Sequence, residues 1–349
     1  MKVSTKARIA TAALVELGMQ RATNPARLAD IATRLDVSLS HLEHLFALLR
    51  RHELVEGFRG PGGGYVLARA ARDISVGDIV YCVDQLDAQS AAEREAALAA
   101  LGGTAAASLA QIAESCDQAV IAVFNTEQVE HTVDALVKAR PAGRPALITC
   151  CVSTCDPDRI EALVARTPAA KLRYVESPVS GTSDQTEKGD ALGMIGGDPA
   201  AADEAKAILD AICPRRHHLG PAGSGGRAKL AINLILGINR AGLAEGLVFA
   251  QKLGLDPGNF LKVARESAAQ SQVMDVKGPK MVAGDYSPHG FIHQTRKDFL
   301  LMLEQAKARG QGLPLAETYV GIVNGCVAAG EADFDNSAVI EEIRRRKPA

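Results

Sequence analysis

The apolar residues of the first third of the chain change from helical to strand-like spacing. Residues 5–17 and 26–34 have the spacing of amphipathic helices, and Asn24-Pro25 predicts an N-cap followed by a helix-starting proline. A third helix is predicted after Ser38, an N-cap residue, with a buried face at Leu39, Leu42, Leu45, Phe46 and Leu49. Two short apolar runs then flank a glycine-rich turn, Arg59-Gly60-Pro61-Gly62-Gly63-Gly64-Tyr65. Helices followed by such a hairpin predict a winged helix.

The glycine-rich turn has two other interpretations. A phosphate-binding loop would run from a strand into a helix N-terminus, whose free N–H groups meet the anion. A strand follows the glycines here, so the flanking pattern contradicts a phosphate loop. A structural hairpin without a binding partner is the second alternative, because turns rich in Gly and Pro are common.

From residue 118 onwards, short apolar runs alternate with helices. The runs have the composition of buried strands and span residues 118–124, 146–152, 172–179 and 191–197. Helices are predicted over residues 127–139 and 157–167, the second with Asp156 as N-cap and Pro157 in its first turn. This alternation predicts a doubly wound parallel sheet with right-handed crossovers. After Gly226 the sequence becomes almost wholly helical, beginning with a helix over residues 227–253.

These patterns predict an α/β chain with an additional all-α part. Its segments are a winged helix over residues 1–84, a linker or dimerisation helix over 85–103, an incomplete Rossmann-like sheet over 104–222 and a helical domain over 223–349. Residues 76–83 are expected to form a closing helix after the wing. Residues 88–101 are rich in helix formers, as expected of an ordinary linker helix; a subunit-joining helix, which is what the family resemblance of residues 1–84 given below implies here, is an equally favoured interpretation.

Composition narrows the class of protein only moderately. With 349 residues, 47% of them hydrophobic, the chain can bury more than one core. The formal net charge of -2 means that any DNA binding must come from a local surface. The sequence has no apolar run of membrane-spanning length and no signal-peptide pattern near Met1, so we expect a cytoplasmic protein that does not enter membranes.

Seven cysteines are spread along the chain without a paired framework, at positions 82, 116, 150, 151, 155, 213 and 326. This distribution is typical of reduced thiols. The group Cys150, Cys151 and Cys155 could form a redox site, but its place at the end of an apolar run favours a buried strand end. His289 and His293 are too isolated to predict a metal site.

Lys229 and Asn233 form a second candidate site. They lie four residues apart on a predicted helix, so they share one face, just beyond the glycine-rich segment 223–226. A desolvated ammonium beside an amide can transfer a proton. Taken alone, the pair also fits a surface lysine near a helix start.

Residues 1–84 resemble the winged helix-turn-helix domain of the IscR-like repressors, the bacterial family that includes the iron-sulfur cluster regulator. The resemblance rests on the segments 4–8, 28–32, 38–43 and 59–65. It implies binding to double-stranded DNA, with Ser38, Ser40 and Glu43 at the major groove, Arg59 in the minor groove, and Lys6, Arg50 and Arg51 near phosphates. Iron-sulfur members carry three closely spaced cysteines after this domain. Here Cys82 is followed by no cysteine until Cys116, so no cluster is expected.

Residues from about 104 to 345 resemble the β-hydroxyacid dehydrogenases, which include 3-hydroxyisobutyrate dehydrogenase. The likeness begins near Ala96. The matching segments are 153–157, 176–182, 223–233 and 297–299, together with Phe291. Three positions depart from the family pattern: Glu176 stands for the usual Asp, Thr182 for a Gly, and Gly226 for an Asn or Gln.

The dehydrogenase resemblance also implies roles for individual residues. Lys229 would relay the proton of a substrate hydroxyl and Asn233 would orient the substrate. Ser180, Gly181 and Thr182 would hold the substrate carboxylate, with Ser153 and Thr154 nearby. A nicotinamide cofactor, NAD or NADP, would contact Phe124, Asn125, Thr154, Phe291 and Lys297.

One unit of the dehydrogenase pattern has no counterpart in this sequence. The family begins with a strand, a Gly-x-Gly-x-x-Gly turn and a helix that bind the cofactor pyrophosphate, and this sequence contains no such motif. Cofactor binding is therefore doubtful, and residues 118–124 should form an unpaired sheet edge that a partner subunit or the winged domain could cover.

Three hypotheses follow from the two resemblances. The favoured one is a DNA-binding transcriptional regulator whose dehydrogenase-derived part senses a small hydroxy acid or mediates dimerisation. The second is an NAD(P)-dependent 3-hydroxyacid dehydrogenase with an appended winged helix. The third is a fusion with neither activity. A homodimer or higher homo-oligomer is expected, because two-fold symmetry suits a repressor-like domain.

Overall fold

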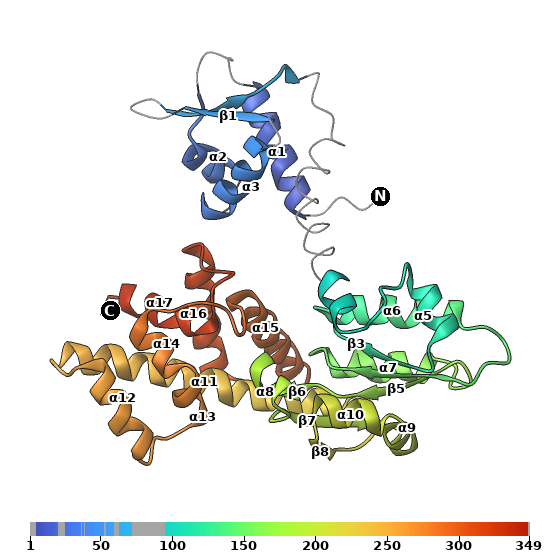
Figure 1. The fold of residues 1–349 in the computed structure, drawn as a ribbon. Coiled ribbons are helices and arrows are strands. Elements are labelled where there is room, and N and C mark those ends of the chain that lie inside the picture. The colour runs from blue at the N-terminus through green and yellow to red at the C-terminus, as the bar shows by residue number, and fades with distance from the viewer. Residues whose placement is uncertain are drawn as a thin grey trace. The chain divides into compact units, whose positions relative to one another are not determined.

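The computed structural model describes residues 5–19, 25–35, 37, 39–51, 54–58, 63–71 and 95–347. The chain forms two compact units, the first reaching Ala105 and the second beginning at Ala106 (Figure 1). The described part of the first unit ends with a helix over residues 95–100. The predicted helix over residues 76–83 and the first part of the predicted helix 88–101 lie outside the described residues.

Up to residue 71, the described part of the first unit forms three helices and a two-stranded hairpin. They are α1 (Thr5–Met19), α2 (Leu28–Leu35), α3 (Leu39–Arg51), β1 (Val55–Phe58) and β2 (Gly64–Leu67). The strands are antiparallel, with Val55 opposite Leu67. The predicted apolar face of α3 is confirmed at Leu42, Leu45, Phe46 and Leu49, which are fully buried against α1 and α2. Leu39 was wrongly predicted to be buried: it is the first residue of α3 and is 40% exposed.

The second helix begins at Leu28, two residues later than predicted, because the backbone of Ala26 pairs with the hairpin. Ala26 N donates to Tyr65 O (2.9 Å), and Tyr65 N donates to Ala26 O (2.8 Å). This close approach explains one glycine of the turn, since a Cβ on Gly64 would lie 2.4 Å from Ala26 O. The neighbouring residues 59–62 lie outside the described part of the chain.

The second unit begins with a mixed sheet and its covering helices. These elements are α5 (Leu109–Ser115), β3 (Gln118–Ile121), α6 (Thr126–Ala139), β4 (Leu147–Cys151), α7 (Pro157–Arg166), β5 (Leu172–Glu176), β6 (Val179–Ser180), α8 (Ser183–Glu187), β7 (Leu192–Gly197), α9 (Pro199–Glu204), α10 (Lys206–Ile212) and β8 (Arg215–His218). The strand order is β3-β4-β5-β7-β6, with β8 also paired to β7.

The expectation of a wholly parallel sheet is correct for β3, β4 and β5 but wrong beyond them. β7 runs antiparallel to β5 and to β6, whereas β8 is parallel to β7. A parallel connection needs a crossover of about a dozen or more residues. The chain between Glu176 and Leu192 is instead used by β6 and the short helix α8. For the same reason the predicted strand 172–179 divides into β5 and β6.

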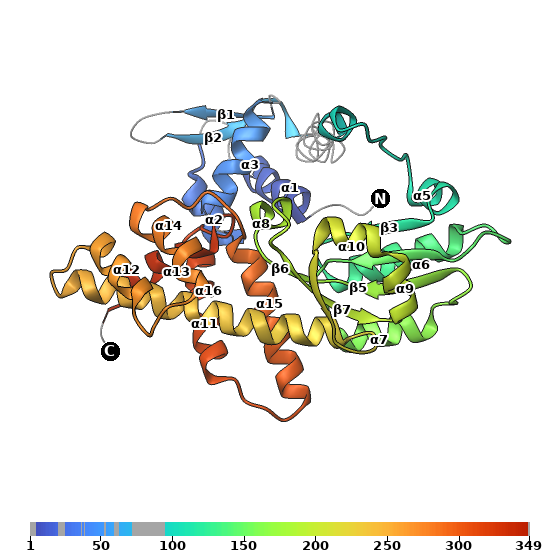
Figure 2. The ribbon, with the colours of Figure 1, turned by 60° about the horizontal axis from the view of Figure 1, so that its bottom comes forward.

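Helices cover both faces of the sheet (Figure 2). Alternate residues of β4 point to opposite faces. Leu147 and Cys151 pack with the apolar side chains of α6 and α7, whereas Ile148 and Cys150 pack with those of α9 and α10. Both cysteines are buried, which confirms the prediction of a buried strand end. Asp156 caps α7 as predicted, accepting hydrogen bonds from the backbone N–H groups of Asp158 and Arg159.

β3 is the last strand at one side of the sheet among the described residues, as the sequence predicted. It pairs with β4 alone, and its Val120 side chain is 45% exposed.

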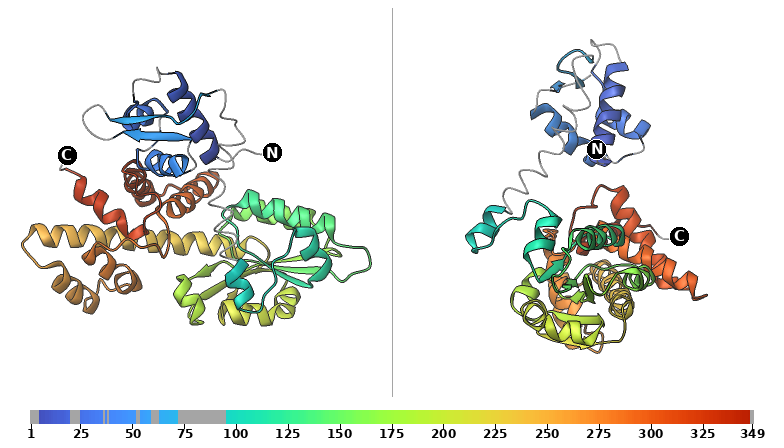
Figure 3. Two further views of the ribbon diagram at one scale, coloured as in Figure 1. Left: turned by 45° about the horizontal axis from the view of Figure 1, so that its top comes forward. Right: turned by 90° about the vertical axis from the view of Figure 1, so that its right-hand side faces the viewer.

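The remainder of the second unit is helical. It contains α11 (Ser224–Lys252), α12 (Pro257–Glu266), α13 (Gln272–Val276), α14 (Gly278–Ala283), α15 (Ile292–Ala308), α16 (Pro314–Ala328), the short 3-10 helix η2 (Asn336–Ala338) and α17 (Val339–Arg345). The long helix α11 runs from the sheet into this helical part, packing against β7, α15 and α17 (Figure 3). By length and composition α11 could span a membrane. Its Leu230, Leu243 and Leu247 instead belong to the core of the helical part.

Candidate small-acid site

Lys229 and Asn233 line a cavity of about 270 Å³ in the second unit. One wall is the loop Ser180, Gly181 and Thr182, and another is formed by α15 with Phe291 and Asp298. The four-residue spacing of Lys229 and Asn233 places both on one face of α11. Six of the predicted site residues therefore meet at one cavity: Ser180, Gly181, Thr182, Lys229, Asn233 and Phe291.

The ammonium of Lys229 is held in a partly buried position. Its Nζ donates a hydrogen bond to Val179 O at 2.7 Å. Burial lowers the pKa of Lys229 from 10.5 to about 8; the charge of Asp298 raises it, and that of Lys297 lowers it further. A lysine with this pKa gives up its proton near neutral pH far more readily than a surface lysine.

Asn233 and Lys297 are both linked to Asp298. Asn233 Nδ2 donates to Asp298 Oδ2 at 3.0 Å, and Lys297 Nζ lies 3.1 Å from Asp298 Oδ1. The carboxylate therefore holds the amide of Asn233 through one of its two N–H groups.

The hydroxyls of Ser180 and Thr182, which lie in the loop lining the cavity, differ in their hydrogen bonds. The Ser180 hydroxyl has no hydrogen-bond partner within the described part of the chain. Thr182 caps α8: its hydroxyl accepts from Gln185 N (3.2 Å), while Gln185 Oε1 accepts from Thr182 N (2.9 Å). Among the described residues, the Thr182 hydroxyl accepts but does not donate, so both Ser180 and Thr182 keep an O–H donor that a carboxylate could use without displacing an existing bond.

Glu176 anchors the start of α11 to the sheet. Its carboxylate is 3% exposed and accepts backbone N–H bonds from Gly223 (2.7 Å), Gly225 (3.2 Å) and Gly226 (3.1 Å). Burial raises the pKa of Glu176, and these N–H groups oppose that rise. A Cβ on Gly226 would lie 2.8 Å from Glu176 Oε1, so the glycine leaves the space that this carboxylate occupies.

The predicted cofactor residues form a second cluster beside the cavity. Lys297 Nζ donates to Phe124 O and Thr154 O, at 3.0 Å each, and lies 5.2 Å from the centre of the Phe124 ring. His293 contacts the rings of both Phe124 and Phe291, with centroids 5.7 and 5.0 Å away. Phe124, Thr154, Phe291 and Lys297 are thus brought together.

Ser153 and Asn125 have structural partners in this region. The Ser153 hydroxyl donates to Val123 O (2.7 Å) and accepts from Val123 N (2.8 Å), which ties the loop after β4 to the end of β3. The Asn125 side chain caps α6 by accepting from Gln128 N. Neither residue lines the cavity, so their assigned ligand contacts stay predictions.

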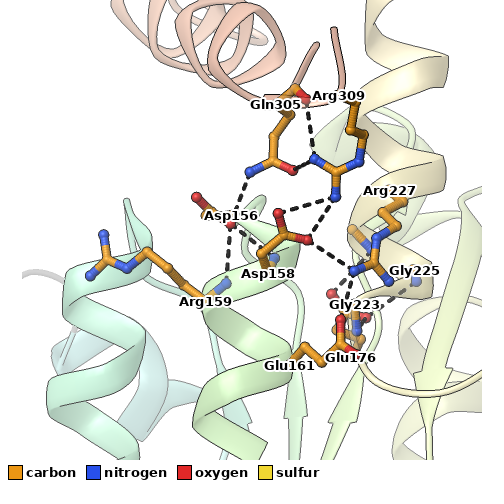
Figure 4. A network of polar contacts seen from close by, with 11 residues as sticks. Asp156, Asp158, Arg159, Glu161, Glu176, Gly223, Gly225, Arg227, Gln305 and Arg309 are labelled. Atoms are coloured by element: carbon orange, nitrogen blue, oxygen red, sulfur yellow. Dashed lines mark hydrogen bonds and ion pairs between the residues drawn. The ribbon is translucent and has the colours of Figure 1, made fainter. Parts of the chain in front are cut away.

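A polar network joins α7 to α11 and α15 (Figure 4). Asp158 accepts from Arg227 (2.9 Å) and from Arg309 (2.8 Å). Gln305 donates to Asp156, and Arg227 also contacts Glu161. The network fixes α7, at the sheet, to the helices that carry Lys229 and Lys297.

The described residues do not complete a dinucleotide site. The strand that would precede β3 and carry the glycine turn has no counterpart in the strand order of the described sheet, and the sequence contains no Gly-x-Gly-x-x-Gly motif. Among the described residues, those assigned to the nicotinamide end are present, whereas a pyrophosphate anchor is not. In the part of the chain that the structure describes, no group of three or more His, Cys, Asp or Glu side chains could hold a metal ion. Cys82 lies outside that part, so the expectation of no iron-sulfur cluster stays a prediction.

Glu43 and Arg50 are the predicted DNA-contacting residues whose side chains are described. Both are exposed on α3, seven residues apart on one helix face. Ser38 and Arg59 lie outside the described residues, as do the side chains of Lys6, Ser40 and Arg51.

Arg240 is a cavity residue that the sequence analysis missed. It follows Lys229 by eleven positions, which is about three helical turns, and therefore lies on the same face of α11. A charged residue on the buried face of an apolar helix was the signal that could have revealed it.

Comparison with known protein families assigns each part of the chain. The Rrf2 family of iron-dependent transcriptional regulators matches residues 3–135. The NAD-binding domain of 6-phosphogluconate dehydrogenase matches residues 73–220, beginning well before Ala96 and overlapping the Rrf2 match. The NAD-binding family of NADP-dependent 3-hydroxyisobutyrate dehydrogenase matches residues 223–343.

Individual relatives support the same division. The chain is 27% identical to 2-hydroxy-3-oxopropionate reductase of Escherichia coli, over 82% of this chain and 94% of that protein. It is 32% identical to glyoxylate/succinic semialdehyde reductase 2 of Arabidopsis thaliana, but spans only 49% of that relative's length. The crystal structure of 3-hydroxyisobutyrate dehydrogenase from Salmonella typhimurium superposes with a TM-score of 0.66 at 28% identity, covering 71% of this chain and 87% of that one. The chain therefore joins an Rrf2-type, IscR-like N-terminal domain to the NAD-binding and helical domains of a 3-hydroxyisobutyrate dehydrogenase-like protein.

Proposed function

We propose that this protein is a DNA-binding transcriptional regulator whose dehydrogenase-like part senses a small hydroxy acid. The observation that carries the proposal is the combination of an Rrf2-type domain with a formed acid pocket that lacks a pyrophosphate anchor. The first unit would act as a winged helix, with α3 in the major groove and the hairpin turn at the minor groove. A cytoplasmic homodimer on two-fold symmetric DNA is part of the proposal.

The exposed face of α3 supports this use. Glu43 and Arg50 project from it while its opposite face is buried, so the helix can enter a groove without unfolding the domain. Because the whole chain has a net charge of only -2, binding must depend on this local surface and should weaken steeply with salt.

Arg59→Ala tests the DNA-binding part. Duplexes enriched from a random-sequence pool by the parent protein should bind the variant about tenfold more weakly, with a smaller salt slope, because a minor-groove arginine would be lost. Fluorescence anisotropy of labelled duplex at several salt concentrations measures both. Arg166→Ala removes an exposed arginine of α7 and serves as the matched control. Equal affinity of Arg59→Ala and parent would remove Arg59 from the interface, and failure to enrich any duplex would refute the regulator.

A second candidate function is an NAD(P)-dependent 3-hydroxyacid dehydrogenase. The lowered pKa of Lys229, to about 8, favours it, because this lysine can take the proton of a substrate hydroxyl. Asn233 and the Ser180 loop would position the acid. A bound nicotinamide would accept the hydride.

Calorimetric titration with NAD and NADP separates the two candidates. We expect no saturable binding at micromolar cofactor, since the pyrophosphate anchor is missing. Saturable binding together with oxidation of 3-hydroxy acids, abolished in Lys229→Ala, would establish the dehydrogenase instead.

A further inference from the structure

Arg240 is a buried cation in the acid pocket that has no carboxylate partner. Its side chain is 9% exposed and lines the cavity. Its Nη1 donates to the Tyr319 hydroxyl at 2.9 Å, while the buried Nε has no acceptor. Within the described part of the chain, no carboxylate lies within ion-pair distance of it. A buried guanidinium without a counter-charge is costly unless a ligand supplies that charge.

The carboxylates of Asp335 and Asp298 already pair with other cations. Asp335 is fully buried and accepts from Lys277 Nζ at 2.8 and 2.9 Å, with further N–H bonds from Ser337 and His289. Burial would raise the pKa of Asp335, but the bond and charge of Lys277 bring it down to about 2, so the pair is ionised and self-compensated. Asp298 is shared between Lys297 and Asn233.

The cavity therefore carries excess positive charge at two places. Among the described residues, Lys229, Arg240 and Lys277 line it, and Asp298 is the one carboxylate that does. After Lys277 is paired with Asp335, Lys229 and Arg240 remain along one face of α11. Both side chains line the cavity, about three helical turns apart along α11.

We propose that the pocket selects a diacid, with one carboxylate at the Ser180 loop near Lys229 and the second at Arg240. This inference rests on the proposed small-acid site and names its ligand class. A planar guanidinium suits a carboxylate because two parallel N–H groups can meet its two oxygens. A monoacid would leave Arg240 uncompensated and should bind less well.

The test compares how tightly the whole chain binds diacids and monoacids of equal carbon number. Succinate, glutarate and adipate are titrated calorimetrically beside butyrate, pentanoate and hexanoate. We expect at least one diacid to bind about tenfold or more tightly than its monoacid, the effect of one charge-assisted contact. In Arg240→Met this ratio should fall to about one while monoacid affinity is kept, and Arg240→Lys should retain part of it.

Arg296→Met provides the matched control, because Arg296 is exposed on α15 and bonds to Asn324 outside the cavity. If no diacid exceeds its monoacid in the parent protein, or if the ratio survives in Arg240→Met, the proposal is wrong. The parent comparison remains decisive should Arg240→Met fail to fold. DNA binding is measured in a separate experiment. A negative DNA result would therefore not change the diacid result, and a negative diacid result would not change the DNA result.

Discussion

Asp335→Ala should lower the free energy of unfolding by about 3–5 kcal/mol, the usual cost of breaking a buried ion pair from one side. Asp335 has no exposed surface and Lys277 is 6% exposed, so the lysine left behind would be a buried charge without compensation. The backbone N–H groups of His289 and Ser337 would lose their acceptor as well. Urea unfolding followed by circular dichroism measures the change.

Asp134→Ala is the matched control for that experiment. Asp134 pairs with Arg166 at 2.7 Å, but both side chains are 53% exposed, so the loss should stay below about 1 kcal/mol. Equal effects of the two substitutions would show that burial does not govern the Asp335 pair.

Lys229→Met should stabilise the protein at pH 7 by about 2 kcal/mol. Lowering the pKa of Lys229 from 10.5 to about 8 corresponds to about 3 kcal/mol, and partial exposure of the side chain reduces this. The pocket would thus keep its lysine at the expense of stability, as ligand sites often do.

The stability gained in Lys229→Met should depend on pH, because the pKa of Lys229 differs between the folded and unfolded states. Below about pH 8 the lysine is protonated in both states and the folded protein carries the full cost, so the gain of the variant is largest there. Between about 8 and 10.5 only the unfolded chain holds the proton, and the gain declines toward zero. Unfolding curves at pH 7 and 10.5 check it, with the exposed Lys206→Met as control. A gain independent of pH would mean that methionine packing, not the charge, causes it.

The sequence predicted those elements whose signals are local. α6 and α7 lie close to the predicted ranges, and Asp156 caps α7 as predicted, whereas the cap of α6 by Asn125 was not predicted. Of the five residues of α3 that were predicted to be buried, four are buried, and Leu39 is the exception.

Features that depend on distant contacts escaped the sequence analysis. The start of α2 moved because Ala26 pairs with Tyr65, which lies far along the chain. β8 has the sequence Arg-Arg-His-His and no apolar pattern, since its side chains are largely exposed. The strand direction beyond β5 depends on how the connection to β7 is used, because β6 and the short helix α8 occupy it in place of a crossover helix.

The sequence predicted only part of the candidate site, because the rest of the site depends on distant contacts. Lys229 and Asn233 are four residues apart, so helical spacing alone joins them. Arg240 is three turns away, and its missing counter-charge becomes visible only when Asp335 and Asp298 are seen to be engaged elsewhere.

Two departures from the dehydrogenase pattern, at positions 176 and 226, compensate each other in side-chain volume. The longer acid at position 176 reaches the three glycine N–H groups, and it can do so only because position 226 carries no side chain. Shortening the acid alone would leave a hole beneath α11, and adding an amide at 226 alone would collide with the carboxylate. These two sites should therefore change together or not at all as homologous sequences diverge.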